Sequence, residues 1–251
     1  METTNITINN TNIVFYTPNV TCEKRARSIL KKEPYTIKWL DSFNEGEVLL
    51  DIGANVGVYS LYGAIIKQVN VFAFEPESQN FAILNKNIVL NKINNKIVAF
   101  PIALSNSNEY TFLFLSKFTQ GGSHNNIKQP ILKDNKLFRK GTTAYKQGSV
   151  CSTIDFLIDK NIIPIPDHIK IDVDGSEPEV IQGSLNTLKK LHIKSILIEV
   201  ETNRQDHMAM VDMIKNTGFV FCKKQVAACL CKSGSFKGQT CYIFYREKST
   251  L

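Results

Sequence analysis

The sequence predicts an α/β protein whose mostly parallel sheet is covered by helices on both faces. Short apolar segments typical of buried strands alternate with helical segments, and this alternation occurs twice, over residues 48–102 and 169–217. The chain has 251 residues, of which 43% are hydrophobic and 21% charged, so it can bury the core of one such domain.

Residues 1–45 are predicted to form an N-terminal extension ahead of a main domain at 46–251. Alternating apolar residues around an Asn-Asn pair, which is typical of a turn, predict a short β-hairpin over residues 5–16. Residues 21–45 have a helical pattern, with Pro34 as a break or as the start of a new helix.

The main domain begins with the first alternation of strands and helices. Its predicted strands are 48–51, 71–75 and 96–102, and its predicted helices are 57–67 and 78–90. In the second alternation the predicted strands are 169–172 and 195–200, and the predicted helices are 177–188 and 208–217. Gly218 is suited to cap the last of these helices.

Two further regions complete the predicted domain. Residues 219–222 and 241–245 are expected to form a C-terminal antiparallel hairpin around a turn that contains Gly and Ser. Residues 106–149 contain one strand-like run at 110–115 and then a long polar stretch. A loop of this length in a compact domain is typically a lid or a binding loop, so we expect an inserted lid or substrate loop here.

Composition narrows the classes of partner and compartment. Lys and Arg number 30 against 23 Asp and Glu, and this net charge of +7 is scattered, as on an ordinary solvated surface. No apolar stretch approaches the roughly 18 residues of a membrane span, and no secretory signal pattern is present, so we expect a cytoplasmic protein. The six cysteines form no C-x-x-C pair, which favours reduced thiols over a zinc site.

The strongest functional motif is D-x-G-x-N-x-G, formed by Asp51, Gly53, Asn55 and Gly57 directly after a predicted strand and before a helix. Glycines there allow the tight turn and close backbone approach that a ligand at the carboxyl end of a strand needs. The spacing differs from the dinucleotide G-x-G-x-x-G and from the P-loop. An acid in this turn suits a positively charged ligand, so S-adenosylmethionine fits better than NAD.

Glu75 ends the next predicted strand, 24 residues after Asp51. A carboxylate in this position can accept hydrogen bonds from both hydroxyls of a ribose. The two motifs together, in order and at strand ends, predict a cofactor of the adenosine type.

A third motif, I-K-I-D-V-D-G-S-E-P-E over residues 169–179, also joins a strand to a helix. The helix dipole alone accounts for the acids in the first helical turn, including Glu177. It does not account for Asp172 at the strand's end, where a carboxylate could take a proton from a hydroxyl nucleophile; structural capping is the alternative.

The chain resembles the FkbM family of S-adenosylmethionine-dependent methyltransferases. The stretches that carry this resemblance are VLLDIGANVGVYS (48–60), VFAFEPESQNFAILNKNIVLN (71–91), IALS (102–105), STIDFL (152–157) and IKIDVDGSEPEVIQG (169–183). The family typically has Glu where this chain has Asp174, which keeps the charge. Residues 1–45 and 106–149 have no comparable match, and we expect acceptor specificity to lie there.

The resemblance implies a Rossmann-like class I methyltransferase fold with a seven-stranded sheet and a cofactor over the first two strand ends. Gly53, Asn55 and Gly57 would line its methionine part, Glu75 its ribose, and the segment from Ala103 to Ser105 its adenine. The family mostly methylates hydroxyls, often of sugars or of metabolites that carry sugars. A small-molecule or glycan acceptor is therefore expected, although a fold alone does not determine a substrate.

The predicted reaction is in-line methyl transfer to a hydroxyl, with Asp172 as the first choice of base and His124, in the predicted lid, as the second. Asp174, Glu177 and Glu199 are predicted to lie near the substrate or to support the residues that contact it. A Mg²⁺ ion on the acids at these strand ends is possible but not favoured.

Three other functions are weighed against this one. The net charge would suit a nucleic-acid methyltransferase, but the N-P-P-Y, D-P-P-Y and Pro-Cys motifs of such enzymes are missing. A non-catalytic binding module would not need the intact cofactor motifs, and a dehydrogenase would need the dinucleotide glycine spacing. The sequence leaves the acceptor, the methylated position and the oligomeric state open.

Overall fold

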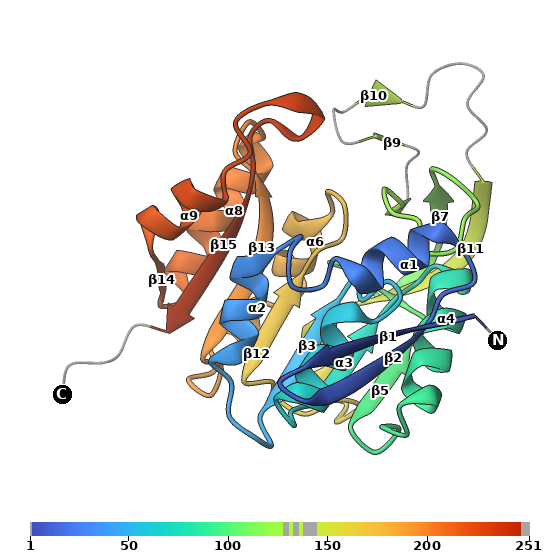
Figure 1. The fold of residues 1–251 in the computed structure, drawn as a ribbon. Helices are drawn as coiled ribbons and strands as arrows, with labels where there is room; N and C mark the ends of the chain where they lie inside the picture. Colours follow the sequence, from blue (N-terminus) through green and yellow to red (C-terminus); the bar gives the residue numbers. More distant parts are fainter. Residues whose placement is uncertain (1, 128–130, 133–135, 138–144, 247–251) are drawn as a thin grey trace.

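A computed structural model describes residues 2–127, 131–132, 136–137 and 145–246 (Figure 1). Its centre is a seven-stranded sheet in the order β14-β15-β13-β12-β3-β4-β5. The strands are β3 (Val48–Ile52), β4 (Asn70–Phe74), β5 (Ile97–Phe100), β12 (His168–Ile171), β13 (Ser195–Glu201), β14 (Phe219–Phe221) and β15 (Gln239–Arg246). Strand β15 runs antiparallel to both of its neighbours, β13 and β14. The other neighbouring strands of this sheet are parallel to each other. The predicted α/β fold is confirmed.

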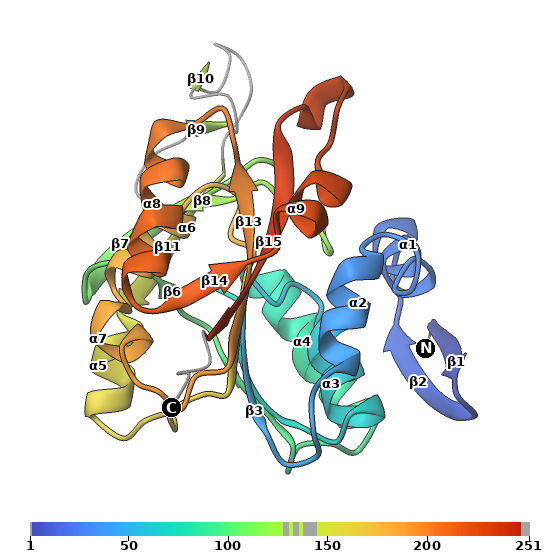
Figure 2. The same cartoon turned by 90° about the vertical axis from the view of Figure 1, so that its left-hand side faces the viewer.

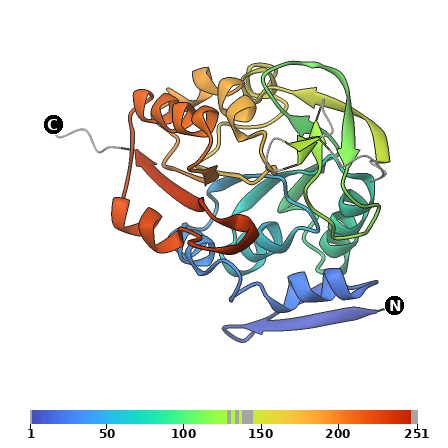
Figure 3. The same ribbon diagram turned by 90° about the horizontal axis from the view of Figure 1, so that it is seen from above.

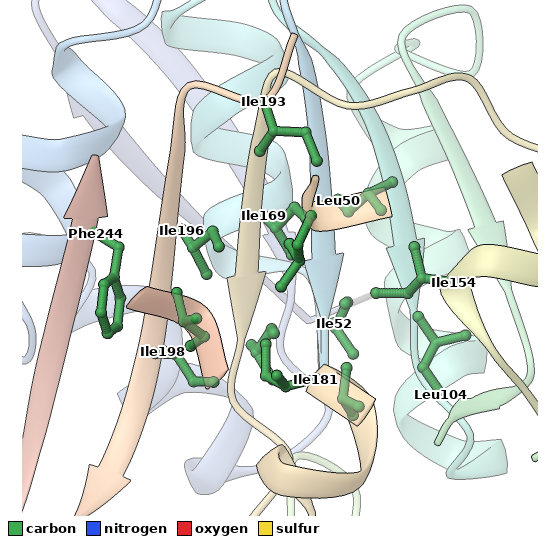
Figure 4. Close-up of a cluster of buried hydrophobic side chains, with 14 of the residues drawn as sticks. Leu50, Ile52, Leu104, Ile154, Ile169, Ile181, Ile193, Ile196, Ile198 and Phe244 are labelled. Carbon is green, nitrogen blue, oxygen red and sulfur yellow. The ribbon is translucent and has the colours of Figure 1, made fainter. Parts of the chain in front are cut away.

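Helices cover both faces of this sheet (Figure 2). On one face lie α2 (Pro34–Asp41), α3 (Val58–Ile66) and α4 (Ser78–Leu90). On the other face lie α5 (Ile154–Asp159), α6 (Glu177–Gln182), α7 (Leu185–Leu188) and α8 (Gln205–Asn216). Because side chains alternate along a strand, Leu50 and Ile52 join one core with the second helix group, whereas Leu49 joins the other (Figure 4).

The described residues before position 46 form a hairpin and two helices. The hairpin pairs β1 (Thr3–Ile8) with β2 (Thr11–Tyr16) through Asn9 and Asn10, whose φ angles of 48° and 63° suit the tight turn. Pro34 begins α2 rather than breaking a helix, after α1 (Val20–Arg27). The hairpin lies at the edge of the molecule, where the side chain of Asn87 on α4 accepts a hydrogen bond from the Tyr16 N–H at 2.7 Å (Figure 3).

A second sheet holds much of the region predicted as one long loop. It has the order β6-β11-β7-β8, formed by β6 (Ala103–Leu104), β7 (Glu109–Leu115), β8 (Asn126–Ile127) and β11 (Tyr145–Ser152). The prediction missed β11 because its sequence is polar and mostly exposed, and its register comes from the distant strand β7. The short strands β9 (Ile131–Leu132) and β10 (Lys136–Leu137) pair with each other. Residues 128–130, 133–135 and 138–144 of the predicted lid lie outside the described residues.

Two other predicted elements differ in the structure. The predicted helix 177–188 is divided into α6, which ends with Gly183 as its C-cap, and α7. A Cβ atom at Gly183 would lie 2.1 Å from the carbonyl oxygen of Ser105, so the close packing there requires glycine. The predicted turn between β14 and β15 is instead α9 (Lys223–Cys229) followed by a 3₁₀ turn, η1 (Gly234–Phe236). Gly218, with φ 91°, follows α8 as predicted. No helix within the described ranges has the length and apolarity to cross a bilayer.

Candidate active site

A cavity of about 660 Å³ lies at the carboxyl ends of the central strands. This is where the topology of an open α/β sheet places ligands. Among the residues predicted to form the site, those on its wall are Gly53, Asn55, Glu75, Ala103, His124, Asp172, Asp174 and Glu199. The structure therefore brings together residues from three separate sequence motifs.

The turn between β3 and α3 forms one part of the wall. Gly53 has φ 78°, and a Cβ atom there would lie 1.9 Å from the carbonyl oxygen of Asp172, so this position requires glycine. Asn55 also has a positive φ, 52°, and its backbone N–H donates to Glu75 Oε2 at 2.7 Å. Gly57, by contrast, lies off the wall, and a Cβ atom there would meet Leu84 of α4 at 2.4 Å. The structure shows a packing role for Gly57, and its contact with a cofactor stays a prediction.

Glu75 presents a buried carboxylate to the cavity at the end of β4. Its two oxygens accept hydrogen bonds from the backbone N–H groups of Asn55 and Glu77, at 2.7 and 2.9 Å. Burial raises the pKa of Glu75 to about 7. With roughly four lone-pair positions on a carboxylate, Glu75 keeps capacity for ligand hydroxyls.

Asp51 lies behind the wall rather than on it. Its side chain is 1% exposed, accepts a hydrogen bond from Ser60 Oγ at 2.6 Å and pairs with the ammonium of Lys170 at 3.1 Å. In the structure the cation that Asp51 meets is Lys170, and a contact between Asp51 and a cationic cofactor stays a prediction. Burial alone would lower the pKa of Lys170, but the negative charges of Asp51, Asp172 and Glu33 raise it above its ordinary value.

Asp172 lies on the wall beside that ion pair. Its Oδ2 is 3.8 Å from the Lys170 ammonium, and its side chain is 33% exposed. Burial raises the pKa of Asp172, and the negative charges of Glu33 and Asp174 act in the same direction, against the lowering effect of Lys170. A carboxyl group with a raised pKa accepts a proton more readily than an ordinary aspartate, which suits general base chemistry.

Asp174 joins the loop after β12 to the loop that carries His124. The backbone N–H of His124 donates to Asp174 Oδ2 at 2.6 Å, and its ring Nδ1 lies 3.3 Å from Oδ1. The His124 ring also stacks with Phe236 at a centroid distance of 6.2 Å. Both residues predicted as possible bases, Asp172 and His124, therefore line the same cavity.

The loop before His124 is hydrogen-bonded to Asn55 in the turn between β3 and α3. The carbonyl oxygen of Gly122 accepts hydrogen bonds from the side-chain amides of Asn55 and Asn80, at 2.7 and 3.1 Å. From the N-terminal extension, Arg25 Nε donates to the carbonyl oxygen of Gly121 at 2.6 Å. The predicted lid region thus contributes a segment that the cofactor turn and α1 hold in place.

Two more predicted residues lie off the wall. Ser105 is buried, and its backbone N–H donates to the carbonyl oxygen of Ser152, so it supports β6 instead of facing the cavity. Glu177 is completely buried and accepts hydrogen bonds from the N–H groups of Val173 and Gly175, at 3.0 and 3.3 Å. Burial, together with the charge of Glu199, raises the pKa of Glu177 to about 8. Glu177 therefore fixes the loop that carries Asp172.

Sequence reasoning missed several wall residues. Lys170 could have been noticed as a charged residue inside an apolar strand, I-K-I, but no role was assigned to it. Glu33, from the N-terminal extension, and Cys229 and Cys241, from the C-terminal segment, carry no local signal that places them here. In the part of the chain that the structure describes, no three His, Cys, Asp or Glu side chains are grouped so as to hold a metal ion.

The strand order, the single antiparallel strand and the cavity together define a Rossmann-like class I methyltransferase fold. Residues 51–221 match the model of the methyltransferase FkbM domain, and the chain belongs to this family.

Individual relatives are more distant. The hexuronic acid methyltransferase AglP of Haloferax volcanii is 26% identical over 167 residues, which cover 66% of this chain and 62% of AglP. A crystal structure of methyltransferase FkbM from Methylobacillus flagellatus KT has a TM-score of 0.50 at 13% identity and covers 81% of this chain and 44% of its own. The METTL16 methyltransferase domain has a TM-score of 0.50 at 12% identity, over 96% of this chain and 86% of its own. This chain thus spans less than two thirds of the first two relatives.

Proposed function

We propose that the protein is an S-adenosylmethionine-dependent O-methyltransferase that acts on a hydroxyl group of a sugar or glycan. The observation that carries the proposal is that Glu75 and Asp172 line one cavity. Glu75 follows β4 and Asp172 follows β12, the two strands that flank β3. Family membership supports methyl transfer, and the name of AglP supports a sugar acceptor.

The residues present fit this cofactor. The cavity volume lies within the roughly 300–1,000 Å³ that is usual for small-molecule sites. Glu75 offers a buried carboxylate for ribose hydroxyls, and the turn at Gly53 and Asn55 forms the adjoining wall. Ala103, with its neighbours Ile102 and Leu104, adds an apolar wall suited to an adenine ring. When bound, S-adenosylmethionine supplies a methyl group on a positively charged sulfur that a hydroxyl oxygen can displace.

The chain's own residues would bind the acceptor and accept the proton of its hydroxyl group. Asp172, with its raised pKa, receives the hydroxyl proton of the acceptor. Lys170 lies close enough to Asp172 to fix the orientation of its carboxylate, and Glu177 fixes the loop behind it. His124 is the alternative proton acceptor, since it lies on the same wall. Most of the rate enhancement would come from holding the two reactants in line.

The test is transfer of a radiolabelled methyl group from S-adenosylmethionine to a panel of methyl hexopyranosides and methyl hexuronosides. We expect label in a product that survives mild base, because a methyl ether is stable there whereas a methyl ester hydrolyses. Label that mild base removes would place the methyl group on a carboxylate and contradict O-methylation of a hydroxyl. Absence of transfer to every glycoside would contradict the sugar acceptor.

A further inference from the structure

Besides Thr21 and Arg25 of α1, two segments of the cavity wall lie outside residues 51–221, the part that matches the family model. One is residues 32–36, at the start of α2, and the other lies within residues 228–241, from the end of α9 to β15. Figure 2 shows α2 and α9 on the same side of the sheet. Because the proposed cofactor contacts all lie within residues 51–221, these two segments are available for contact with the acceptor.

Glu33 is held rigidly in the first of these segments. Its carboxylate accepts hydrogen bonds from Lys32 Nζ at 2.9 Å and from Thr36 Oγ1 at 3.1 Å. Burial alone would raise the pKa of Glu33, but the ammonium groups of Lys32 and Lys170 outweigh it and lower the pKa below its usual range. Glu33 is therefore an ionised acceptor of hydrogen bonds at neutral pH.

The position of Glu33 does not require an acid for helix capping. Glu33 is the N-cap residue of α2, yet its side chain makes no capping hydrogen bond to the backbone of the helix. The helix instead begins with Pro34, whose missing N–H needs no partner. Glu33 lines the cavity, and the two donors named above use two of the roughly four lone-pair positions of its carboxylate.

Glu33 also shares its surroundings with the proposed base. The ammonium of Lys170 lies 3.8 Å from Asp172, and its charge also acts to lower the pKa of Glu33. Glu33 and Asp172 both line the cavity. Two carboxylates that face one cavity can receive two hydroxyl groups of one molecule.

We propose that Glu33 is an acceptor-binding residue contributed by the N-terminal extension, and that it receives a hydroxyl next to the one that is methylated. The acceptor is then a polyhydroxylated ring with at least two neighbouring hydroxyls, as in a pyranose, and not a molecule with one hydroxyl. This inference rests on the proposed function. It goes beyond it in assigning acceptor selection to a residue outside the family's shared domain.

The experiment compares Glu33→Gln with wild type on the best methyl hexopyranoside and on its monodeoxy analogues. The matched control is Glu23→Gln, in the same extension, where Glu23 pairs with Arg27 on the exposed surface of α1. Loss of a charge-assisted hydrogen bond should raise the KM of Glu33→Gln for the glycoside about 10-fold or more. The affinity for S-adenosylmethionine, measured by calorimetric titration, should stay unchanged in both variants.

The deoxy analogues test the same contact in the wild-type protein, so the result does not depend only on whether the Glu33→Gln variant folds normally. Wild type should lose about 10-fold or more in kcat/KM when the neighbouring hydroxyl is removed, and Glu33→Gln should be nearly indifferent to that removal. A KM for Glu33→Gln within about twofold of the control would overturn this inference and leave the proposed function standing. Failure of wild type to bind S-adenosylmethionine, or to methylate any glycoside, would overturn both.

Discussion

The amino ends and the carboxyl ends of the central strands both carry buried acids, in contrasting surroundings. At the amino end, Glu47 accepts hydrogen bonds from His168 Nε2 at 2.9 Å and from Lys194 at 2.5 Å, and these bonds, with those from Asn44, lower its pKa to about 2 although burial acts in the opposite direction. At the carboxyl end, burial raises the pKa of Glu75 to about 7 and that of Glu177 to about 8.

At the amino end, the side chains of Trp39, Ser195, His168 and Glu47 form a continuous hydrogen-bond network. The indole N–H of Trp39 donates to Ser195 Oγ at 2.8 Å, so the Ser195 hydroxyl can donate to His168 Nδ1 at 2.7 Å, and His168 Nε2–H then donates to Glu47. Phe43 stacks on the His168 ring at 3.6 Å. This arrangement has the order of a Ser-His-acid triad, but all its members are buried, so it stabilises the fold. Raised pKa values at the other end are typical of a functional site.

The largest expected effect is at the carboxyl end. Asp172→Asn keeps the size of the side chain but removes the proton acceptor, so turnover should fall about 100-fold or more. The affinity for S-adenosylmethionine should change little, because Asp172 is assigned to the acceptor. Steady-state kinetics and calorimetric titration on the same preparation check this; turnover within about threefold of wild type would remove Asp172 as the base.

A substitution in the amino-end network should lower the free energy of unfolding instead of the turnover. Ser195→Ala leaves the Trp39 N–H and His168 Nδ1 without their buried partner and should lower the free energy of unfolding by about 2–4 kcal/mol. Ser28→Ala, which removes only a part-buried hydrogen bond to Arg25, is the control and should cost less than about 1 kcal/mol. Urea unfolding measures both, and equal effects of the two changes would mean that the network contributes nothing special.

A smaller effect concerns pH, and the two ends act in opposite directions. The folded pKa values of Glu75 and Glu177 are raised, so their contribution to stability is present below their unfolded pKa near 4.5 and is lost as the pH rises through about 7 to 8. The folded pKa of Glu47 is lowered, so its contribution is present above 4.5 and is lost as the pH falls toward 2.

The free energy of unfolding should therefore decrease between pH 6 and 8.5, by an amount on the order of 1–3 kcal/mol. S-adenosylmethionine should bind better at the upper end of this range, because the ionised form of Glu75 accepts its hydroxyls. Denaturant unfolding across this pH range checks the first statement. A stability that stays constant from pH 6 to 8.5 would show that the carboxyl-end acids are not held at raised pKa values.

The sequence predicted local structure well where the pattern was local. The apolar strands predicted at 48–51 and 71–75 are present as β3 and β4, and α4 spans the predicted residues 78–90. The elements that the sequence did not predict depend on contacts between distant residues or lack an apolar pattern. Strand β11 is defined by pairing with β7, and α9 buries none of its residues and so has no clear apolar face.

The same distinction holds for the candidate site. Residues within the motifs, such as Gly53, Glu75 and Asp172, could be proposed because strand ends of a parallel sheet converge at one edge. The interpretation of Asp51 as a cofactor contact did not foresee that Lys170, two residues before Asp172, is aligned with it in the register of β12 and β3. Glu33 reaches the cavity only because α2 packs against the sheet, which no local pattern encodes.

The most direct test of the contrast between the two ends is calorimetric titration of S-adenosylmethionine into wild type, Glu75→Ala and Ser195→Ala. The account predicts that wild type binds, that Glu75→Ala binds about 10-fold or more weakly because hydrogen bonds to a charged group are lost, and that Ser195→Ala binds like wild type. Equal affinities for wild type and Glu75→Ala, or no binding by wild type, would contradict the assignment of the carboxyl end as the cofactor site.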